Sequence, residues 1–220
     1  MKTSRLVAIA GISLIGVAFV GCSSGSSSSG PPTTSRPRTT TTLTPPTTTT
    51  AVPTSLQPYL LAVTDLPTGW AVDNSPTSPA PSCYSNPLTK VPSVAYTDAK
   101  FTQGGSTPVL IEQLGYYTAA TNDFATIKGR LDACKSFTET EGGTTASGVL
   151  GAMSFPSYGN QSAAYVATIT VEGTTLNQGF VVAQKGNYLV IVALGDIGTF
   201  DQVSLQQFTA QALGKIPGGQ

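Results

Sequence analysis

"AAYVATITVEGTTLNQGFVVAQKGNYLVIVAL", residues 163–194, contains three apolar runs rich in β-branched residues, separated by two short polar turns. The runs cover residues 163–171, 175–184 and 188–194, and a glycine stands in each turn, at Gly173 and Gly186. Because glycine adopts positive φ at low cost, both turns suit hairpin connections. The stretch therefore predicts a three-stranded antiparallel meander.

Further strands are predicted upstream of the meander. Residues 93–101 and 107–117 have strand-like composition and flank a glycine pair at 104–105. Residues 145–155 form a weaker strand candidate, and Trp70 begins a short strand after a Pro-Thr-Gly turn. From these candidates and the meander we expect an antiparallel sheet of about five to six strands.

Three segments carry apolar residues at helical spacing. The first, within residues 55–66, ends before Pro67, because the residue before a proline disfavours helix. The second is capped by Thr121 or Asn122, and the third covers about residues 200–216. The positions expected to be buried are Leu56, Tyr59, Leu60 and Val63 in the first segment, Phe124, Ile127, Leu131, Cys134 and Phe137 in the second, and Val203, Leu205, Phe208, Ala212, Leu213 and Ile216 in the third. An antiparallel sheet packed with amphipathic helices is the α+β class.

The residues before this domain divide into an export signal and a tether. Lys2 and Arg5 precede an apolar run at 6–20, which is typical of a signal peptide and shorter than the ~20 residues that span a bilayer. Residues 22–55 consist almost entirely of Ser, Thr, Pro and Gly, which predicts a disordered tether. The sequence therefore predicts a signal peptide at 1–21, a tether at 22–55 and one domain at 56–220.

Residues 19–22, FVGC, resemble a bacterial lipobox, in which the peptide is cut before Cys22 and the cysteine is acylated. Phe19 stands where a lipobox usually has leucine. Two or more acyl chains such as palmitate anchor a protein stably, so we expect a lipoprotein held at the extracytoplasmic side of the cell membrane. The alternative is an ordinary secretory signal with a chance cysteine.

Two cysteines remain in the domain, Cys83 and Cys134. An even number of cysteines in an exported chain favours a disulfide bond. Such a bond would close a loop of about 50 residues and contribute on the order of 4 kcal/mol of stability. The alternative is a pair of buried free thiols.

The zero net charge of the whole chain conceals an acidic domain. All 11 acidic residues lie within residues 56–220, with seven of the 11 basic residues, so the domain carries about −4. An acidic domain without a basic cluster argues against nucleic acid as a partner and against docking on anionic lipid by charge alone.

The chain lacks the residues that most enzymes use. It contains no histidine, which excludes Ser-His-Asp and Cys-His catalysis and the commonest metal ligand. With both domain cysteines assigned to a disulfide, no thiolate nucleophile is left, so we expect no cofactor, no metal and no enzyme activity. A glycosidase-like carboxylate pair is the remaining catalytic possibility. The available glutamates are Glu112, expected to face solvent on a strand, Glu139 and Glu141 after a helix, and Glu172 in a turn.

Aromatic residues are the other candidates for a site. Trp70 follows a turn, Tyr116 and Tyr117 end a predicted strand, and Phe155 and Tyr158 flank a Pro-Ser pair. These five side chains could line a ligand pocket. The alternative is packing in the core and loops.

Three stretches carry a resemblance to a known group of proteins. These are LLAVTDLPTGW at 60–70, the helix that ends near Cys134, and the hairpin VVAQKGNYLVIVAL at 181–194. Together they resemble actinobacterial lipoproteins with a sensor-like domain, and the extracellular domain of the mycobacterial receptor kinase PknH. The resemblance implies an antiparallel sheet with helices, a cleft and a ligand-sensing role, and it supplies no catalytic residues. The kinase domain has two disulfides, whereas this chain has cysteines for one.

Three functions follow as hypotheses. The first is a cell-envelope lipoprotein whose domain binds a small molecule, lipid or glycan as a sensor or carrier. The second is a module that binds an envelope protein through a sheet face or strand edge. The third is a hydrolase with two carboxylates within about 10 Å of each other.

Overall fold

The computed structural model describes residues 52–75, 83–84, 86–141 and 144–218. The expected signal peptide, the acylated Cys22 and nearly all of the tether lie outside the described residues. Among the residues described, no helix is long and apolar enough to cross a membrane.

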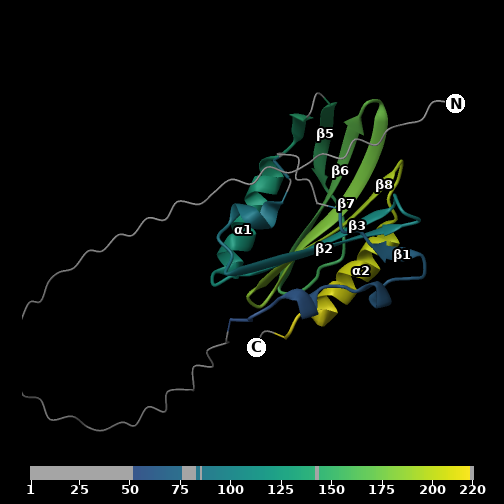
Figure 1. The fold of residues 1–220 in the computed structure, drawn as a ribbon. Coiled ribbons are helices and arrows are strands. Elements are labelled where there is room, and N and C mark those ends of the chain that lie inside the picture. The colour runs from purple at the N-terminus through teal and green to yellow at the C-terminus, as the bar shows by residue number, and fades with distance from the viewer. Residues whose placement is uncertain (1–51, 76–82, 85, 142–143, 219–220) are drawn as a thin grey trace, which may run out of the picture. The chain divides into compact units, whose positions relative to one another are not determined.

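The described chain forms one eight-stranded antiparallel sheet with a long helix on each face (Figure 1). The strand order is β1-β2-β3-β8-β7-β6-β5-β4. The elements are η1 (Gln57–Tyr59), η2 (Val63–Asp65), β1 (Trp70–Val72), η3 (Pro87–Lys90), β2 (Ala95–Gln103), β3 (Val109–Tyr116), α1 (Ala120–Ala133), β4 (Ser136–Glu141), β5 (Thr144–Ala152), β6 (Gln161–Val171), β7 (Thr174–Lys185), β8 (Tyr188–Ile197) and α2 (Gln202–Lys215). Helices and an antiparallel sheet confirm the expected class.

The predicted meander is confirmed as β6, β7 and β8. β6 pairs with β7 from Gln161 to Val171, and β7 pairs with β8 from Leu176 to Lys185. Gly173 and Gly186 have φ of 80° and 58° in the two turns, a conformation that side chains with a Cβ adopt at a cost.

The sheet has eight strands rather than the five to six expected, and β4 was not predicted. Phe137 was expected to continue the apolar stripe of the second helix, and Glu139 and Glu141 were expected to follow that helix, with no strand between residues 136 and 141. The helix stops one turn earlier, where Cys134 takes an extended conformation and donates its N–H to the carbonyls of Arg130 and Leu131. The threonine-rich segment that follows then pairs with β5 along its whole length.

The first predicted helix is wrong in type. The segment forms two single-turn 3₁₀ helices, η1 and η2, with Pro58 in the first turn of η1. Its leucines are buried, as the amphipathic pattern requires, whereas Val63 is exposed. We call residues 56–66 the η1–η2 segment.

The two long helices lie where they were expected, with two corrections. The residue preceding α1 is Ala119, without a side-chain cap, rather than Thr121 or Asn122. In α2, Asp201 caps the helix by accepting the N–H of Val203, and this places Val203 in the first turn with 61% of its surface exposed. The remaining predicted core positions of α2 are buried.

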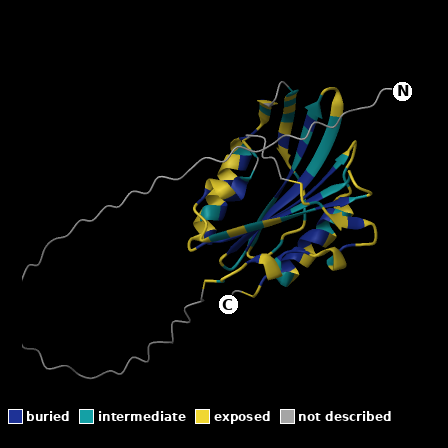
Figure 2. Ribbon diagram, viewed as in Figure 1, coloured by how far each residue is buried: buried dark blue, intermediate teal, exposed yellow. Residues whose placement is uncertain are grey.

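The sheet separates two hydrophobic cores, because side chains alternate along each strand. In β8, Val190, Val192 and Leu194 face α2, whereas the residues between them face α1. We call these sides the α2 face and the α1 face. Both faces of the central strands are buried, and the helices expose their outer surfaces (Figure 2).

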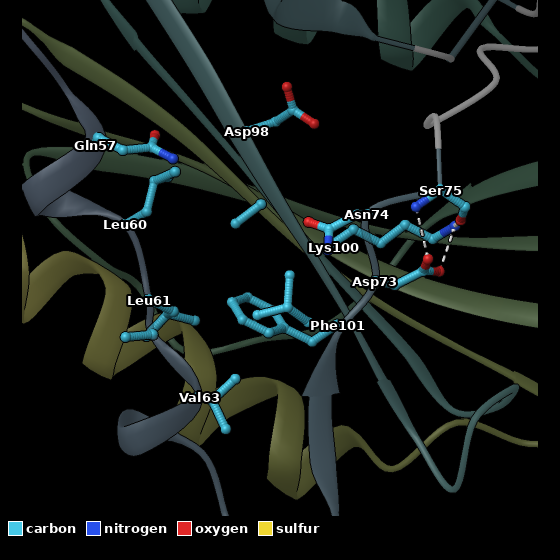
Figure 3. A pocket seen from close by; sticks show the side chains of 13 residues that line it. Gln57, Leu60, Leu61, Val63, Asp73, Asn74, Ser75, Asp98, Lys100 and Phe101 are labelled. Carbon is cyan, nitrogen blue, oxygen red and sulfur yellow. Dashed lines mark hydrogen bonds and ion pairs between the residues drawn. The ribbon is translucent and has the colours of Figure 1, made fainter.

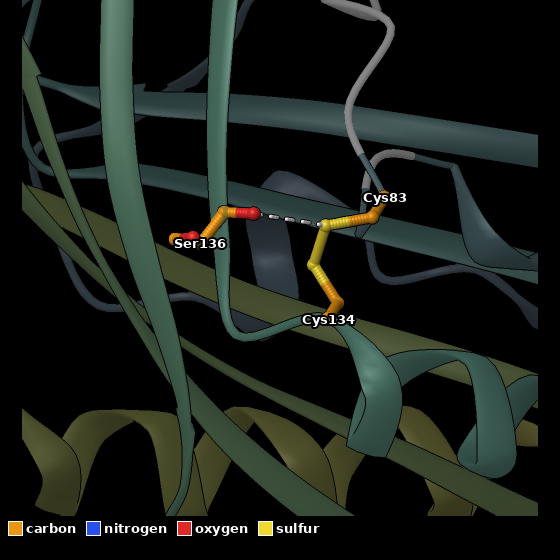
Figure 4. The surroundings of a disulfide bond; sticks show 3 residues. All are labelled: Cys83, Cys134 and Ser136. Atoms are coloured by element: carbon orange, nitrogen blue, oxygen red, sulfur yellow. Dashed lines mark hydrogen bonds between the residues drawn. A yellow bond between two sulfur atoms is a disulfide. The ribbon is translucent and has the colours of Figure 1, made fainter.

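The predicted disulfide bond between Cys83 and Cys134 is confirmed (Figure 4). Its Cα atoms are 5.6 Å apart, and the two cysteines are 51 residues apart in sequence. The bond ties the end of α1 to the long loop between β1 and β2, beside the first residue of β4 (Figure 4).

Candidate functional site

A groove with a volume of about 470 Å³ lies at the β1–β2 edge of the sheet (Figure 3). It is lined by residues 57 and 60–63 of the η1–η2 segment, by residues 72–75 at and after the end of β1, and by residues 98–101 of β2. Three separate stretches of sequence therefore meet around it.

The groove exists because β1 is much shorter than β2. β1 pairs only with residues 101–103 of β2, and one further bond runs from the Asp73 N–H to the Lys100 carbonyl. The chain then leaves the sheet while β2 continues back to Ala95. The η1–η2 segment crosses the α2 face beside this uncovered part of β2, so a space remains between the two.

One side of the groove is apolar. Leu60, Leu61 and Phe101 belong to the α2-side core and contribute to the lining. Val63 and Val72 also line it and remain accessible to solvent, Val72 with 53% of its surface exposed. A ligand could therefore cover apolar surface here that the fold leaves open to water.

The other side of the groove carries an ordered polar cluster (Figure 3). The Lys100 Nζ lies 2.8 Å from the Asp73 Oδ2 and donates to the Ser75 Oγ at 2.9 Å. The pKa of Asp73 is lowered to about 2, mainly by the hydrogen bond from Lys100 and further by Ser75. Asp73 is therefore ionised at neutral pH, and the pair offers both a positive and a negative hydrogen-bonding group.

Polar contacts hold the η1–η2 segment to the sheet and to α2. The Thr97 hydroxyl donates to the Gln57 Oε1 at 2.6 Å, at the rim of the groove. Asp65 forms an ion pair with Lys215 of α2. The η1–η2 segment forms one wall of the groove, and these contacts hold this wall at both of its ends.

A third contact of the same segment is with Glu112 on β3. The backbone N–H of Leu61 donates to the Glu112 Oε2 at 2.6 Å, and the Glu112 Oε1 has no hydrogen-bond partner among the described residues. The expectation that Glu112 faces solvent is wrong, since the residue is 0% exposed. β3 lies between β2 and β8, and the η1–η2 segment covers its α2 face.

Burial raises the pKa of Glu112 from its ordinary value of 4.5 to about 7. The cause is the loss of hydration, which disfavours the charged form. The Leu61 N–H and the positive charge of Lys215 act in the opposite direction, and they only partly offset the effect of burial.

The glutamates whose side chains are described do not form a catalytic pair. Glu112 is on β3 and Glu139 is on β4, five strand positions away in the sheet. At ~4.8 Å per strand, the two strands are about 24 Å apart, which exceeds the separation in glycosidases. Glu172 lies in the turn between β6 and β7.

The five aromatic candidates are divided between the two faces of the sheet. Trp70 packs edge-on against Phe208 with ring centroids 5.6 Å apart, and Tyr116 lies in the same α2-side core. Phe155 and Tyr158 pack partly buried against that core. Tyr117 is in the α1-side core and donates its hydroxyl to the Leu88 carbonyl.

None of these five aromatic residues lines the groove. No motif in the sequence marks the residues that line the groove, so they were not predicted as a site. One signal was present for Glu112: it shares the two-residue period of Leu110, Leu114 and Tyr116, which all face the α2-side core. Within the described ranges, no three potential metal-ligating side chains come together.

The comparisons with known proteins include a similarity of low degree to a solved structure. No family model and no curated protein matches the chain. Among solved structures, the extracellular domain of PknH from Mycobacterium tuberculosis is similar, with 14% sequence identity and a TM-score of 0.47. The match covers 66% of this chain and 76% of that extracellular domain. This is the domain that the sequence resembles, and at this level the similarity supports no conclusion about function.

Proposed function

We propose that this protein is a cell-envelope lipoprotein whose domain binds a small amphipathic ligand reversibly in the groove at the β1–β2 edge. The observation that carries the proposal is the composition of the groove, with open apolar surface on one side and the Asp73–Lys100 cluster on the other. Its volume of about 470 Å³ is in the usual range of ligand sites.

The chemistry of the lining favours a ligand with two unlike parts. An apolar part would cover Leu60, Leu61 and Val72, and gain free energy in proportion to the apolar area removed from water. A part with hydroxyl, amide or ionic groups would bond to Asp73 and Lys100, which fix orientation more than affinity. A lipid with a polar head or a glycan with an apolar substituent has this chemistry.

The site would act by binding, in a sensor or carrier role. Acylated Cys22 and the tether would hold the domain to the extracytoplasmic side of the membrane, and the tether would set its reach. No cofactor is part of the proposal.

The test is native mass spectrometry of the full mature chain, extracted from an actinobacterial host in mild detergent. A reproducible additional mass of a few hundred daltons or more is expected on the wild-type protein. The variant Val72→Asp should lose this mass, since it places a charge on the apolar side of the groove.

The matched control is Val149→Asp, at a strand valine with a similar exposed fraction, 56%, outside the groove. It should keep the additional mass. A ligand that stays bound to the Val72→Asp variant, or a wild-type chain without any ligand, would contradict the proposal. A stoichiometric protein-sized mass would instead support the partner-binding hypothesis.

A further inference from the structure

Among the residues that the structure describes, the Glu112 carboxyl accepts one hydrogen bond, which comes from the wall of the groove. Its Oε2 accepts the N–H of Leu61, whose side chain lines the groove. Its Oε1 is buried without a partner. A neutral carboxyl group tolerates this environment, whereas a carboxylate with one hydrogen bond is poorly stabilised in it.

Within the part of the chain that the structure describes, no cation forms an ion pair with Glu112 to stabilise its ionised form. Its cross-strand neighbours are Ala99 on β2 and Val192 on β8, and both are apolar. The charged groups that act on it are Lys215 of α2 and Asp65 of η2, and these two are paired with each other. Lys185, the last residue of β7, donates to the carbonyls of residues 213 and 216 at the end of α2.

The contact lies in the middle of the wall. The wall is held at one end by the bond between Thr97 and Gln57, and at the other end by the Asp65–Lys215 pair. The Glu112–Leu61 bond is between them, and Leu61 is both a core residue and part of the groove lining. The bond therefore attaches the middle of the wall to β3.

We propose that the protonation state of Glu112 controls the contact between the η1–η2 segment and the sheet. The neutral carboxyl keeps the segment packed on β3, and the ionised carboxylate weakens this packing. We call this pH-dependent contact the Glu112 clasp. As a regulation of ligand binding, this rests on the proposed function. The clasp itself depends only on the residues named above.

Hydration explains why ionisation of Glu112 weakens the contact rather than strengthening it. An ionised Glu112 regains water only if the segment lifts or if water enters from the groove, and both changes weaken the seat of Leu61. The pKa of about 7 places the transition near neutral pH. A ligand that needs the seated wall would bind more weakly above this pH, and its binding there would be accompanied by proton uptake.

The expected size of the effect follows from proton linkage. If the lifted segment returns the pKa of Glu112 to 4.5, the population of the lifted state rises roughly 70-fold between pH 5 and pH 8. About tenfold of this rise falls between pH 6 and pH 8. Such a change is measurable by amide hydrogen exchange at single-residue resolution.

The experiment measures hydrogen exchange of the Leu61 amide in the full chain without ligand, corrected for the intrinsic dependence of exchange on pH. In the wild-type protein, the protection of the Leu61 amide should fall roughly 70-fold between pH 5 and pH 8, with about tenfold of this fall between pH 6 and pH 8. In Glu112→Gln, which cannot ionise, its protection should not change with pH. Glu139→Gln is the matched control, because Glu139 is also buried with an unpartnered Oε1 and lies on β4. It should behave as the wild type.

Equal pH dependence in wild type and Glu112→Gln, or none in the wild type, would overturn the proposal. If Glu112→Gln fails to fold, carboxyl ¹³C NMR of the wild-type chain replaces it. A Glu112 resonance that titrates near pH 7 supports the clasp, and one that titrates near 4.5 overturns it. Since no ligand is used, neither result bears on ligand binding, which the Val72→Asp variant tests separately.

Discussion

Replacing Glu112 with glutamine should change how the stability of the whole domain depends on pH. In the wild-type protein, the folded state holds the proton of Glu112 more tightly than the unfolded chain, because the pKa is raised from 4.5 to about 7 by burial. Raising the pH between these two values therefore removes protons from the unfolded state first, and the free energy of unfolding falls.

The expected loss is about 3 kcal/mol. The two pKa values differ by about 2.5, and each pKa unit corresponds to about 1.4 kcal/mol. The stabilising proton is fully present below pH 4.5, is lost as the pH approaches 7, and has no further effect above it. For a domain of this size, a loss of 3 kcal/mol is a large fraction of the total stability.

Other carboxylates do not obscure this window. The aspartates with shifted pKa values all have them lowered, by hydrogen bonds and cationic neighbours, so they are ionised in both states above pH 5; they are Asp65, Asp73, Asp132 and Asp201. Their contribution to stability is lost at lower pH, where they become protonated in the folded state. A fall in stability between pH 5 and pH 7 is therefore the signature of Glu112.

The assay is urea unfolding of the full chain at several pH values from 5 to 8, followed by the fluorescence of the single tryptophan, Trp70. The wild type and Glu139→Gln should lose stability as the pH rises, whereas Glu112→Gln should lose little. A wild-type stability that is constant or rises over this range would refute the reasoning. So would an unchanged slope in Glu112→Gln.

Three further changes test other parts of the structure. Replacing Cys83 and Cys134 together with serine should lower the free energy of unfolding by on the order of 4 kcal/mol, since the bond spans 51 residues, and an unchanged urea midpoint would contradict this. Gly115→Ala should cost about 1–3 kcal/mol, because its Cβ would lie 2.5 Å from a carbon of the buried Tyr117 ring, whereas Gly151→Ala, with open space around it, should cost much less in the same assay. Cys22→Ala should move the protein from the membrane fraction to the soluble fraction, and retention in the membrane would argue against a lipid anchor.

Much of the fold could be predicted because its strongest signals are local. The meander is specified by β-branched runs and by glycine turns within 32 residues of sequence, and the structure has all three strands. α2 was also predicted, because its apolar period is regular. β4 was missed because Phe137 satisfies the period of α1 as well as that of a strand, and only pairing with β5 decides between them.

The candidate site could not be predicted in the same way. Trp70, Tyr116 and Tyr117 were chosen for their residue type, and adjacent positions on a strand place Tyr116 and Tyr117 on opposite faces. Val72 and Lys100, which do line the groove, are unremarkable in sequence. Their proximity depends on β1 ending after three residues, which no local pattern indicates.

The sequence by itself determined the α+β class, the meander, the positions of α1 and α2 and the partners in the disulfide bond. It could do so because strand and helix periods and turns depend on neighbouring residues, and because two cysteines in the domain allow a single pairing. Only the tertiary structure decided that the η1–η2 segment covers β3, that Glu112 is buried beneath Leu61, and that a groove remains beside β2. These features join residues about 40 to 150 positions apart, and burial, which sets the charge of Glu112, is a property of the assembled fold.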